Sequence, residues 1–393
     1  MPHPSSRISG IVPSGKDGWE VHFEGWARKL AGQDIIMLSV GDHDFDTPSE
    51  TVEAAVRAVR GGHHHYTQLP GIPALREAMA KVSTRSTGVP TSVAQVIATP
   101  GGQSALYAAV QAVLDPGDHA VVVAPYYATY PGTFRAAGAD FTVVETAAED
   151  GFQPRVEAIE KALTPNTKAI LLNTPNNPTG AVYSREALDD IAEVCRRRDL
   201  WLLSDEVYWT LGSGEHVSPR VLEGMAERTL VINSMSKSHG MTGWRIGWLT
   251  GPVAIIKLLI SLNLVSTYGI NDFVSRAAIE ALDNDYGVEW IANVYATRRK
   301  VFLDAVRGTN NIVVRGSEGG MYVMLDVRAI EPNSEKFAWN LLNSENVTVM
   351  PGASFGEAAE GHIRIALTQS EDILREAANR LRRFAANYGS KAA

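Results

Sequence analysis

The segment from residue 232 to residue 247, INSMSKSHGMTGWRIG, presents one lysine and one arginine around a turn of small residues. A strand-like run leads into the turn that carries Lys237, and Arg245 follows eight residues later. A lysine at the carboxyl end of a strand can form a Schiff base if its neighbours lower its pKa. Arg245 and the hydroxyls of Ser234 and Ser236 suit a phosphate group, because arginine makes charge-assisted bidentate contacts. A surface turn with an ordinary lysine would explain this segment equally well.

Two upstream strand ends favour the chemical interpretation. SDEVY closes one strand with Asp205 and places Tyr208 three residues later, and NTPNNPTG closes another with Asn177. A pyridinium-type electron sink requires a carboxylate at its ring nitrogen. Its phenolate oxygen needs hydrogen-bond donors such as a tyrosine hydroxyl and an asparagine amide. Singly, Asp205 could be a helix cap and Asn177 a turn residue, but together with Lys237 they indicate a cofactor site.

Three further features fit such a site. Gly101, Gly102 and Gln103 open a helix directly after a strand, where backbone amides can bind a phosphate. Tyr127 follows the next strand and could stack on a flat ring. Arg364 lies on a short apolar strand, and a buried arginine needs an anion, either a substrate carboxylate or an internal salt-bridge partner.

The elements that must position these side chains alternate along the middle of the chain. Several of the expected strands are continuously apolar, as strands buried on both faces should be. They lie at 95–99, 119–124, 141–145, 169–173, 201–204, 229–233 and 245–249, with helices such as 104–114 and 185–198 between them. This alternation predicts an α/β fold with a mainly parallel sheet.

The last hundred residues follow a different pattern. Strand-like runs at 322–326, 347–349 and 362–366 precede a long closing helix at 372–387, which predicts a smaller α+β domain. We expect a large domain over residues 48–290, and a small domain made of residues 1–47 and 291–393.

The composition excludes several classes of protein. With 36 Lys+Arg against 44 Asp+Glu the formal charge is −8, so we expect no nucleic-acid partner. One cysteine excludes an internal disulfide, and the cluster His63–His65 lacks partners at ligand spacing, so we expect no metal. The longest apolar stretch, 253–265, is too short to span a bilayer, so we expect no membrane partner. The first residues contain no apolar run, which favours a cytoplasmic protein.

Taken in order, these motifs resemble a known family. The stretches LSVGDHDFDTP (38–48), YTQLPGIPALRE, NNPTG, SDEVY, SMSKSHGMTGWRIGW, PGASFG and HIRIAL are similar to fold-type I pyridoxal-phosphate aminotransferases of class I/II, the aspartate aminotransferase-like group. The resemblance covers nearly the whole chain. It implies the PLP-dependent transferase fold, in which a mainly parallel seven-stranded sheet is sandwiched by helices beside the smaller domain.

The resemblance also implies a pyridoxal 5'-phosphate (PLP) cofactor and the residues that hold it. Lys237 would form the internal aldimine and Asp205 would pair with the pyridine nitrogen; with Tyr208 they are the expected catalytic residues. Tyr208 and Asn177 would contact the ring oxygen, and Tyr127 would stack on the ring. The phosphate ligands would be Ser234, Ser236, Arg245 and the loop of Gly101, Gly102 and Gln103.

Substrate binding and assembly follow from the same resemblance. Arg364 would bind the α-carboxylate, with Gly41 and Asn177 completing the substrate-binding set. Tyr66 would reach the phosphate of the neighbouring subunit, which implies a homodimer with shared sites. The motif GDHDFDTP departs from the family in one position, because His43 stands where the family often has proline.

The implied reaction is a ping-pong transfer, through aldimines, of an amino group from an L-amino acid to a 2-oxo acid. AGQDIIMLSVGDHDFDTP, SDEVYWTL and GEHVSP are similar to the arginine–pyruvate transaminase branch. Arginine would need a carboxylate, for which Asp17, Glu20 and Glu24 are candidates. An aspartate or aromatic aminotransferase, or a PLP-dependent C–S β-lyase, could share every cofactor residue. The alternative from another class is the ligand-sensing domain of a regulator.

Overall fold

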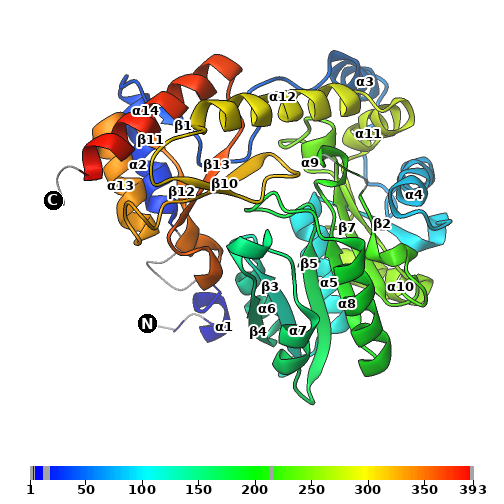
Figure 1. Ribbon diagram of the computed structural model, residues 1–393. Coiled ribbons are helices and arrows are strands. Elements are labelled where there is room, and N and C mark those ends of the chain that lie inside the picture. The colour runs from blue at the N-terminus through cyan, green and yellow to red at the C-terminus, as the bar shows by residue number, and fades with distance from the viewer. Residues whose placement is uncertain (1–2, 4, 12–17, 213, 215, 390–393) are drawn as a thin grey trace.

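The computed structural model describes residues 3, 5–11, 18–212, 214 and 216–389. Within them, a seven-stranded sheet with the order β2-β8-β7-β6-β5-β3-β4 forms the centre of the larger part of the molecule (Figure 1). Neighbouring strands are parallel except at β8, which runs antiparallel to β7 and β2. The strands are β2 (Val96–Thr99), β3 (His119–Ala124), β4 (Asp140–Glu145), β5 (Thr167–Asn173), β6 (Trp201–Asp205), β7 (Thr229–Ser234) and β8 (Gly247–Thr250). The predicted mainly parallel α/β sheet is confirmed.

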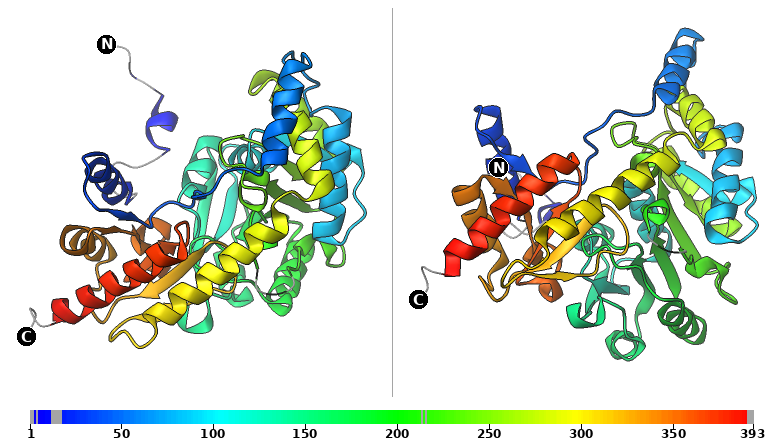
Figure 2. Two further views of the ribbon diagram at one scale, coloured as in Figure 1. Left: turned by 90° about the horizontal axis from the view of Figure 1, so that it is seen from above. Right: turned by 45° about the horizontal axis from the view of Figure 1, so that its top comes forward.

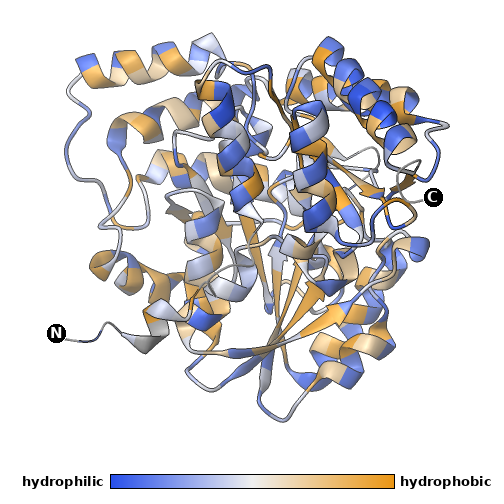
Figure 3. Cartoon of the chain, turned by 90° about the vertical axis from the view of Figure 1, so that its left-hand side faces the viewer, coloured by the Kyte–Doolittle hydropathy of each residue, from blue (hydrophilic) through white to orange (hydrophobic). Residues whose placement is uncertain are grey.

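Helices cover both faces of this sheet, which explains the continuous apolar strands (Figure 3). On β3, Ala120 and Val122 pack with one set of helices, whereas Val121 and Val123 pack with another. The first set is α5 (Gly102–Val113), α6 (Tyr130–Ala137) and α10 (Val253–Val265), and the second is α7 (Val156–Ala162) and α8 (Arg185–Arg198). At the β2 and β8 end of the sheet, α4 (Pro73–Thr87) and α11 (Asp272–Asn284) complete the core.

The smaller part is built on a four-stranded antiparallel sheet with the order β12-β13-β10-β9. Its strands are β9 (Val313–Arg315), β10 (Tyr322–Asp326), β12 (Met350–Pro351) and β13 (His362–Ala366). Around it lie α2 (Trp19–Leu30), α12 (Val288–Val306), α13 (Ser334–Glu345) and α14 (Glu371–Gly389). Both ends of the chain thus contribute to one α+β unit, and α12 and α14 run side by side (Figures 1 and 2). The remaining elements include α1 (Ser6–Ser9), α3 (Ser49–Arg60), α9 (Met235–Ser238), and a two-stranded pair of β1 (Ile36–Met37) with β11 (Val347–Thr348).

Most predicted strands differ from the observed ones by one or two residues at an end, and two of these differences have a clear physical cause. The predicted strand 347–349 ends at Thr348, and β12 begins at Met350. The chain changes sheets at Val349, because β11 pairs with β1 while β12 pairs with β13. The predicted strand 245–249 begins only at Gly247, since Arg245 adopts a left-handed conformation with φ of 53°.

The topology brings three strand ends to one edge. Asn173, Asp205 and Ser234 are the last residues of β5, β6 and β7, which are neighbours in the sheet. Parallel strands present their carboxyl ends at the same edge, where open α/β sheets bind ligands. The segment 38–48, between β1 and α3, passes this edge. In the described part of the chain, no helix has the length and hydrophobicity that crossing a bilayer requires.

Candidate active site

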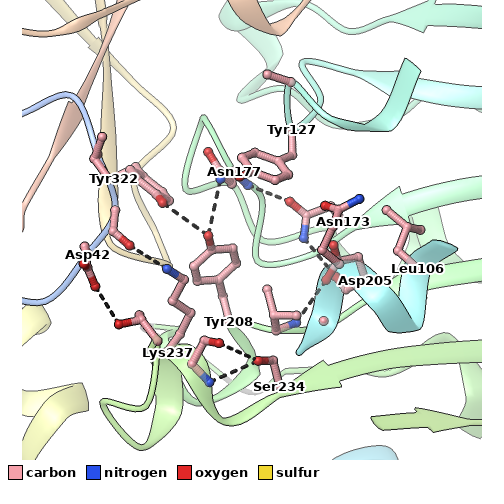
Figure 4. Close-up of a pocket in the computed structure, with 18 of the residues that line it drawn as sticks. Asp42, Leu106, Tyr127, Asn173, Asn177, Asp205, Tyr208, Ser234, Lys237 and Tyr322 are labelled. Atoms are coloured by element: carbon pink, nitrogen blue, oxygen red, sulfur yellow. Dashed lines mark hydrogen bonds between the residues drawn. The ribbon is translucent and has the colours of Figure 1, made fainter. Parts of the chain in front are cut away.

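A pocket of about 320 Å³ lies at this edge of the sheet (Figure 4). Its lining contains most of the predicted site residues, contributed by both sheets and by segment 38–48: Gly41, Gly102, Gln103, Tyr127, Asn177, Asp205, Tyr208, Ser234, Ser236, Lys237, Arg245 and Arg364. The structure therefore brings together groups that lie more than three hundred residues apart in the sequence.

Lys237 lies on α9, directly after β7, and is half-buried. Its Nζ donates a hydrogen bond to the Gly41 carbonyl oxygen at 2.5 Å (Figure 4). The amine is therefore held within the pocket by a neutral acceptor. A primary amine placed in this way can react with a carbonyl group and can carry a proton.

Asp205 is buried at the end of β6 and lines the same pocket as Lys237. Its Oδ2 accepts a 2.6 Å hydrogen bond from the Tyr130 hydroxyl, and its Oδ1 accepts one from the Val207 amide at 3.3 Å. Burial raises the pKa of the carboxyl to about 6, although the Tyr130 hydrogen bond lowers it. Both partners are neutral donors, so the charged carboxylate would be stabilised by a cationic N–H group such as a protonated pyridine nitrogen.

A cluster of hydroxyl and amide groups also lines the pocket. Asn177 donates through Nδ2 to the Tyr208 hydroxyl at 3.3 Å, and the Tyr208 and Tyr322 hydroxyls are 3.3 Å apart. Burial raises the pKa of Tyr208 well above its ordinary value, so its hydroxyl keeps its proton and can donate. This cluster fits an anionic oxygen on a bound ring.

The predicted phosphate ligands form a cradle at the start of α5. Ser234 donates to the Ser236 hydroxyl at 2.9 Å, and Arg245 donates through Nη1 to the Thr242 carbonyl at 2.9 Å. Gly101 has φ of 84°, and a Cβ atom there would lie 2.4 Å from Nη2 of Arg245. Glycine at this position therefore leaves room for the guanidinium beside the helix N-terminus, where a phosphate is favoured.

Gln103 contributes to the same region through its backbone. Its side chain is engaged elsewhere, because it accepts from the Thr129 hydroxyl at 2.8 Å and donates to the Thr133 hydroxyl at 3.2 Å. The Gln103 amide lies in the first turn of α5, where amide groups have no partner within the helix. The geometry of this cradle, together with the environment of Asp205, fits PLP.

Arg364, on β13, is buried against two aromatic rings. Its guanidinium lies 4.4 Å from the centre of the Tyr322 ring and 4.8 Å from that of Phe355. Nη1 donates to Oδ1 of Asn177 at 2.9 Å, Nη2 donates to the Ser39 carbonyl, and Nε has no partner among the described residues. Both hydrogen-bond partners are neutral acceptors, so the geometry favours an external anion over an internal salt bridge.

Tyr66 stands apart from the other predicted ligands. Its side chain is 88% exposed and lies outside the pocket, in edge contact with the ring of Tyr268. Two of the candidate partners for a guanidinium also lie outside the lining, because Glu20 is exposed and Glu24 pairs with Arg28 at 2.7 Å. Asp17 lies outside the described residues.

Several residues that line the pocket were not predicted from the sequence. Among them are Trp19, Asp42, Tyr130 and Tyr322, which come from four separate segments. Asp42 adjoins the predicted Gly41, and this adjacency could have identified it. Tyr130 and Tyr322 carried no local signal, since each reaches the site through the tertiary fold.

Comparisons with known proteins agree with this geometry. The model of the family "Aminotransferase class I and II" matches residues 33–381. The arginine–pyruvate transaminase AruH of Pseudomonas aeruginosa is 41% identical over 379 residues, covering 96% of each chain. The aspartate/prephenate aminotransferase of Thermus thermophilus is 40% identical over 385 residues, covering 96% of this chain and 98% of that one. The structure of the Thermus thermophilus aspartate aminotransferase with maleate superposes with a TM-score of 0.92 at 38% identity, covering 98% of this chain and 100% of the other.

Proposed function

The chain belongs to the class I and II aminotransferases, which are PLP-dependent enzymes, and from this premise we propose that it transfers the amino group of L-arginine to pyruvate. The proposed donor and acceptor come from the 41% identical relative named arginine–pyruvate transaminase. The predicted PLP-dependent transferase fold and PLP-dependent transaminase activity are both confirmed by the comparisons. The roles of individual residues remain proposals.

The charged groups that line the pocket with Lys237 carry the part of the proposal that concerns PLP and the substrate α-carboxylate. Asp205 lacks a cationic partner among its hydrogen bonds, and Arg245 and Arg364 donate to neutral acceptors. Asp205 would pair with the pyridine nitrogen, Arg245 with the phosphate, and Arg364 with the substrate α-carboxylate. When bound, PLP supplies an electron sink that stabilises the negative charge left at Cα after proton removal.

The chain's own residues would then divide the work. Lys237 holds the cofactor and, once its amine is free, moves the proton at the substrate Cα. Asp205 keeps a proton on the ring nitrogen, while Tyr208 donates to the ring oxygen. Arg364 binds the α-carboxylate and orients the donor, and Asn177 is positioned to assist because it contacts both Arg364 and Tyr208.

The charge of the lining supports arginine over a dicarboxylic donor. In the described lining the cations are Lys237, Arg245 and Arg364, each of which already has a proposed role. A second substrate carboxylate would therefore meet no further cation there. The acids in that lining are Asp205 and Asp42, and with Asp205 assigned to the cofactor, Asp42 is the carboxylate available to a guanidinium.

Assembly and location are proposed on the same basis. A homodimer in which Tyr66 reaches the neighbouring phosphate agrees with its 88% exposure. Tyr66 contacts Tyr268, and Val265, three residues before Tyr268 in the sequence, is 80% exposed. Exposed apolar side chains of this kind suit an interface between two copies of the chain. We propose a cytoplasmic enzyme whose large domain spans residues 48–290. The proposed small domain consists of residues 1–47 and 291–393, and α12 runs across the second boundary.

A panel of amino donors against pyruvate and 2-oxoglutarate, followed at the visible absorbance of the cofactor, tests the proposal. Arginine with pyruvate should give the highest kcat/KM, with alanine as product. A higher kcat/KM for aspartate with 2-oxoglutarate would contradict the assignment of donor and acceptor. Release of pyruvate and ammonia from a sulfur amino acid without any 2-oxo acid would favour a β-lyase instead. Lys237→Ala is the control, and it should abolish both turnover and the lysine-dependent absorbance.

A further inference from the structure

The segment 38–48 contacts the catalytic helix α9 and its flanking turn at several points. The Gly41 carbonyl accepts from Nζ of Lys237, Oδ1 of Asp42 accepts from the Thr242 hydroxyl at 2.7 Å, and the Thr47 hydroxyl donates to the Gly240 carbonyl at 2.6 Å. The segment therefore lies alongside the strand-to-helix turn that carries Lys237. Its one departure from the family pattern, His43, lies in the middle of these contacts.

His43 makes two side-chain hydrogen bonds that fix its tautomer. Nε2 lies 3.0 Å from the Ser236 carbonyl oxygen, and Nδ1 lies 2.8 Å from the Tyr295 hydroxyl. A carbonyl oxygen can only accept, so Nε2 carries the proton and Nδ1 accepts from Tyr295. Burial, with a smaller contribution from the charge of Lys237, lowers the pKa of His43 to about 4, so the ring is neutral at physiological pH.

The acceptor of this hydrogen bond belongs to the residue that precedes Lys237. Helix α9 spans only Met235–Ser238, and the last four carbonyl groups of a helix have no partner within it. Such a short helix gains little stability from its own hydrogen bonds. The imidazole donates to one of these carbonyl groups, while the Gly41 carbonyl accepts from the lysine side chain. The backbone and the amine of the lysine turn are thus both held by residues of one segment.

The imidazole is itself held firmly. Its ring centre lies 4.7 Å from that of Phe45 and 5.7 Å from that of Tyr295. The next acid along the segment, Asp44, forms two hydrogen bonds with Arg298 at 2.7 and 2.9 Å and ties the segment to α12. Proline, which the family often carries here, could neither donate to Ser236 nor accept from Tyr295.

We propose that His43 is a positioning residue for Lys237: its Nε2–H fixes the Ser236 peptide and so aims the lysine amine at the reacting centre. The inference rests on the proposed role of Lys237. It concerns orientation, so the loss of the hydrogen bond should lower kcat more than it raises KM for the amino donor.

Two matched variants of the holoenzyme test this role. His43→Leu fills the space but removes both hydrogen bonds, whereas His43→Gln retains a side-chain N–H donor and a carbonyl acceptor. His43→Leu should lower kcat by on the order of tenfold or more, since a misplacement of about 1 Å can cost about 100-fold. KM should stay close to that of the parent, and His43→Gln should recover most of kcat. Equal losses in both variants, or a parental kcat in His43→Leu, would overturn the proposal.

A spectroscopic titration provides a readout that needs no amino donor. The visible absorbance of the lysine-bound cofactor is recorded against pH for the parent and both variants. The midpoint should shift in His43→Leu, because the orientation and neighbours of an ionisable nitrogen set its pKa, and it should return toward the parental value in His43→Gln. Identical midpoints in all three proteins would reject the positioning role even if arginine is not the donor. Absence of the lysine-dependent absorbance in the parent would instead contradict the role of Lys237.

Discussion

Replacing Asp205 by asparagine should change how the stability of the cofactor-free protein depends on pH. The Asp205 carboxyl is buried with neutral donors, and its pKa is raised from the ordinary value of 3.8 to about 6. The folded state therefore binds this proton more tightly than the unfolded state does. Below pH 3.8 the Asp205 carboxyl is protonated in both the folded and the unfolded state, so it favours neither. As the pH rises from 3.8 toward 6, the free energy of unfolding decreases, and above pH 6 it stays at the lower value.

The size of this effect follows from the two pKa values. A rise from 3.8 to about 6 corresponds to about 3 kcal/mol in the free energy of unfolding. Asparagine carries no charge at any of these pH values. The free energy of unfolding of Asp205→Asn, minus that of the parent, should therefore increase by up to about 3 kcal/mol between pH ~4 and pH ~7. The side-chain amide loses one acceptor, which shifts the difference by an amount that does not depend on pH.

Urea unfolding of both proteins, at equal concentration and without cofactor, measures this difference across the pH range. Addition of PLP should reverse the sign of this difference, because a protonated ring nitrogen supplies the missing counter-charge and stabilises the parent protein with its ionised Asp205. Parallel pH profiles of the two cofactor-free proteins would refute the reasoning about burial. A pH-dependent difference that PLP leaves unchanged would refute the pairing of Asp205 with the ring nitrogen.

Three further changes test the other groups of the site. Arg364→Lys should lower kcat/KM for the amino donor by about 10- to 100-fold, because the fork of hydrogen bonds is lost while the charge remains; unchanged kinetics would place the α-carboxylate elsewhere. Gly101→Ala should weaken PLP binding in equilibrium dialysis, since the added Cβ meets Nη2 of Arg245 at 2.4 Å. Gly117→Ala is its control, with a similar φ of 89° and no neighbour within 4 Å. Tyr66→Phe should weaken PLP binding in the dimer without altering the fold, and equal affinity would remove this residue from the neighbouring site.

The sequence predicted the elements of the sheet because their signals are local. The strand of Asp205 is a short apolar run, and helix α8 begins after Ser184, whose hydroxyl accepts from the Ala187 amide as an N-cap. Because open α/β sheets bind ligands at the carboxyl ends of their strands, the sequence also predicted that Asp205, Asn177 and Lys237 share one site. Predictions of this kind need only residue order and periodicity.

The unpredicted parts of the site depend on contacts between distant segments. Tyr130 reaches Asp205 across 75 residues, and His43 reaches Tyr295 across 252. No periodicity encodes such a contact, because it arises from how helices and loops pack after the elements form. The left-handed turn at Arg245 was missed for a related reason, since an apolar run such as 245–249 does not reveal where the strand begins.

Two charged groups buried at the pocket lack an ionic partner among the described residues, and their position bears on function. Elsewhere in the fold, the buried Arg298 pairs with Asp44 through two hydrogen bonds at 2.7 and 2.9 Å. The buried Arg220 and Arg299, in contrast, donate to neutral hydroxyl and carbonyl oxygens. At the pocket, Arg364 and Asp205 are also buried and meet neutral partners among the described residues. Leaving a buried charge without a counter-charge costs several kcal/mol, about as much as breaking a buried pair. Arg364 and Asp205 differ from Arg220 and Arg299 because they line the pocket, where a bound ligand of opposite charge can offset this cost. Their position therefore favours a role in binding ligands.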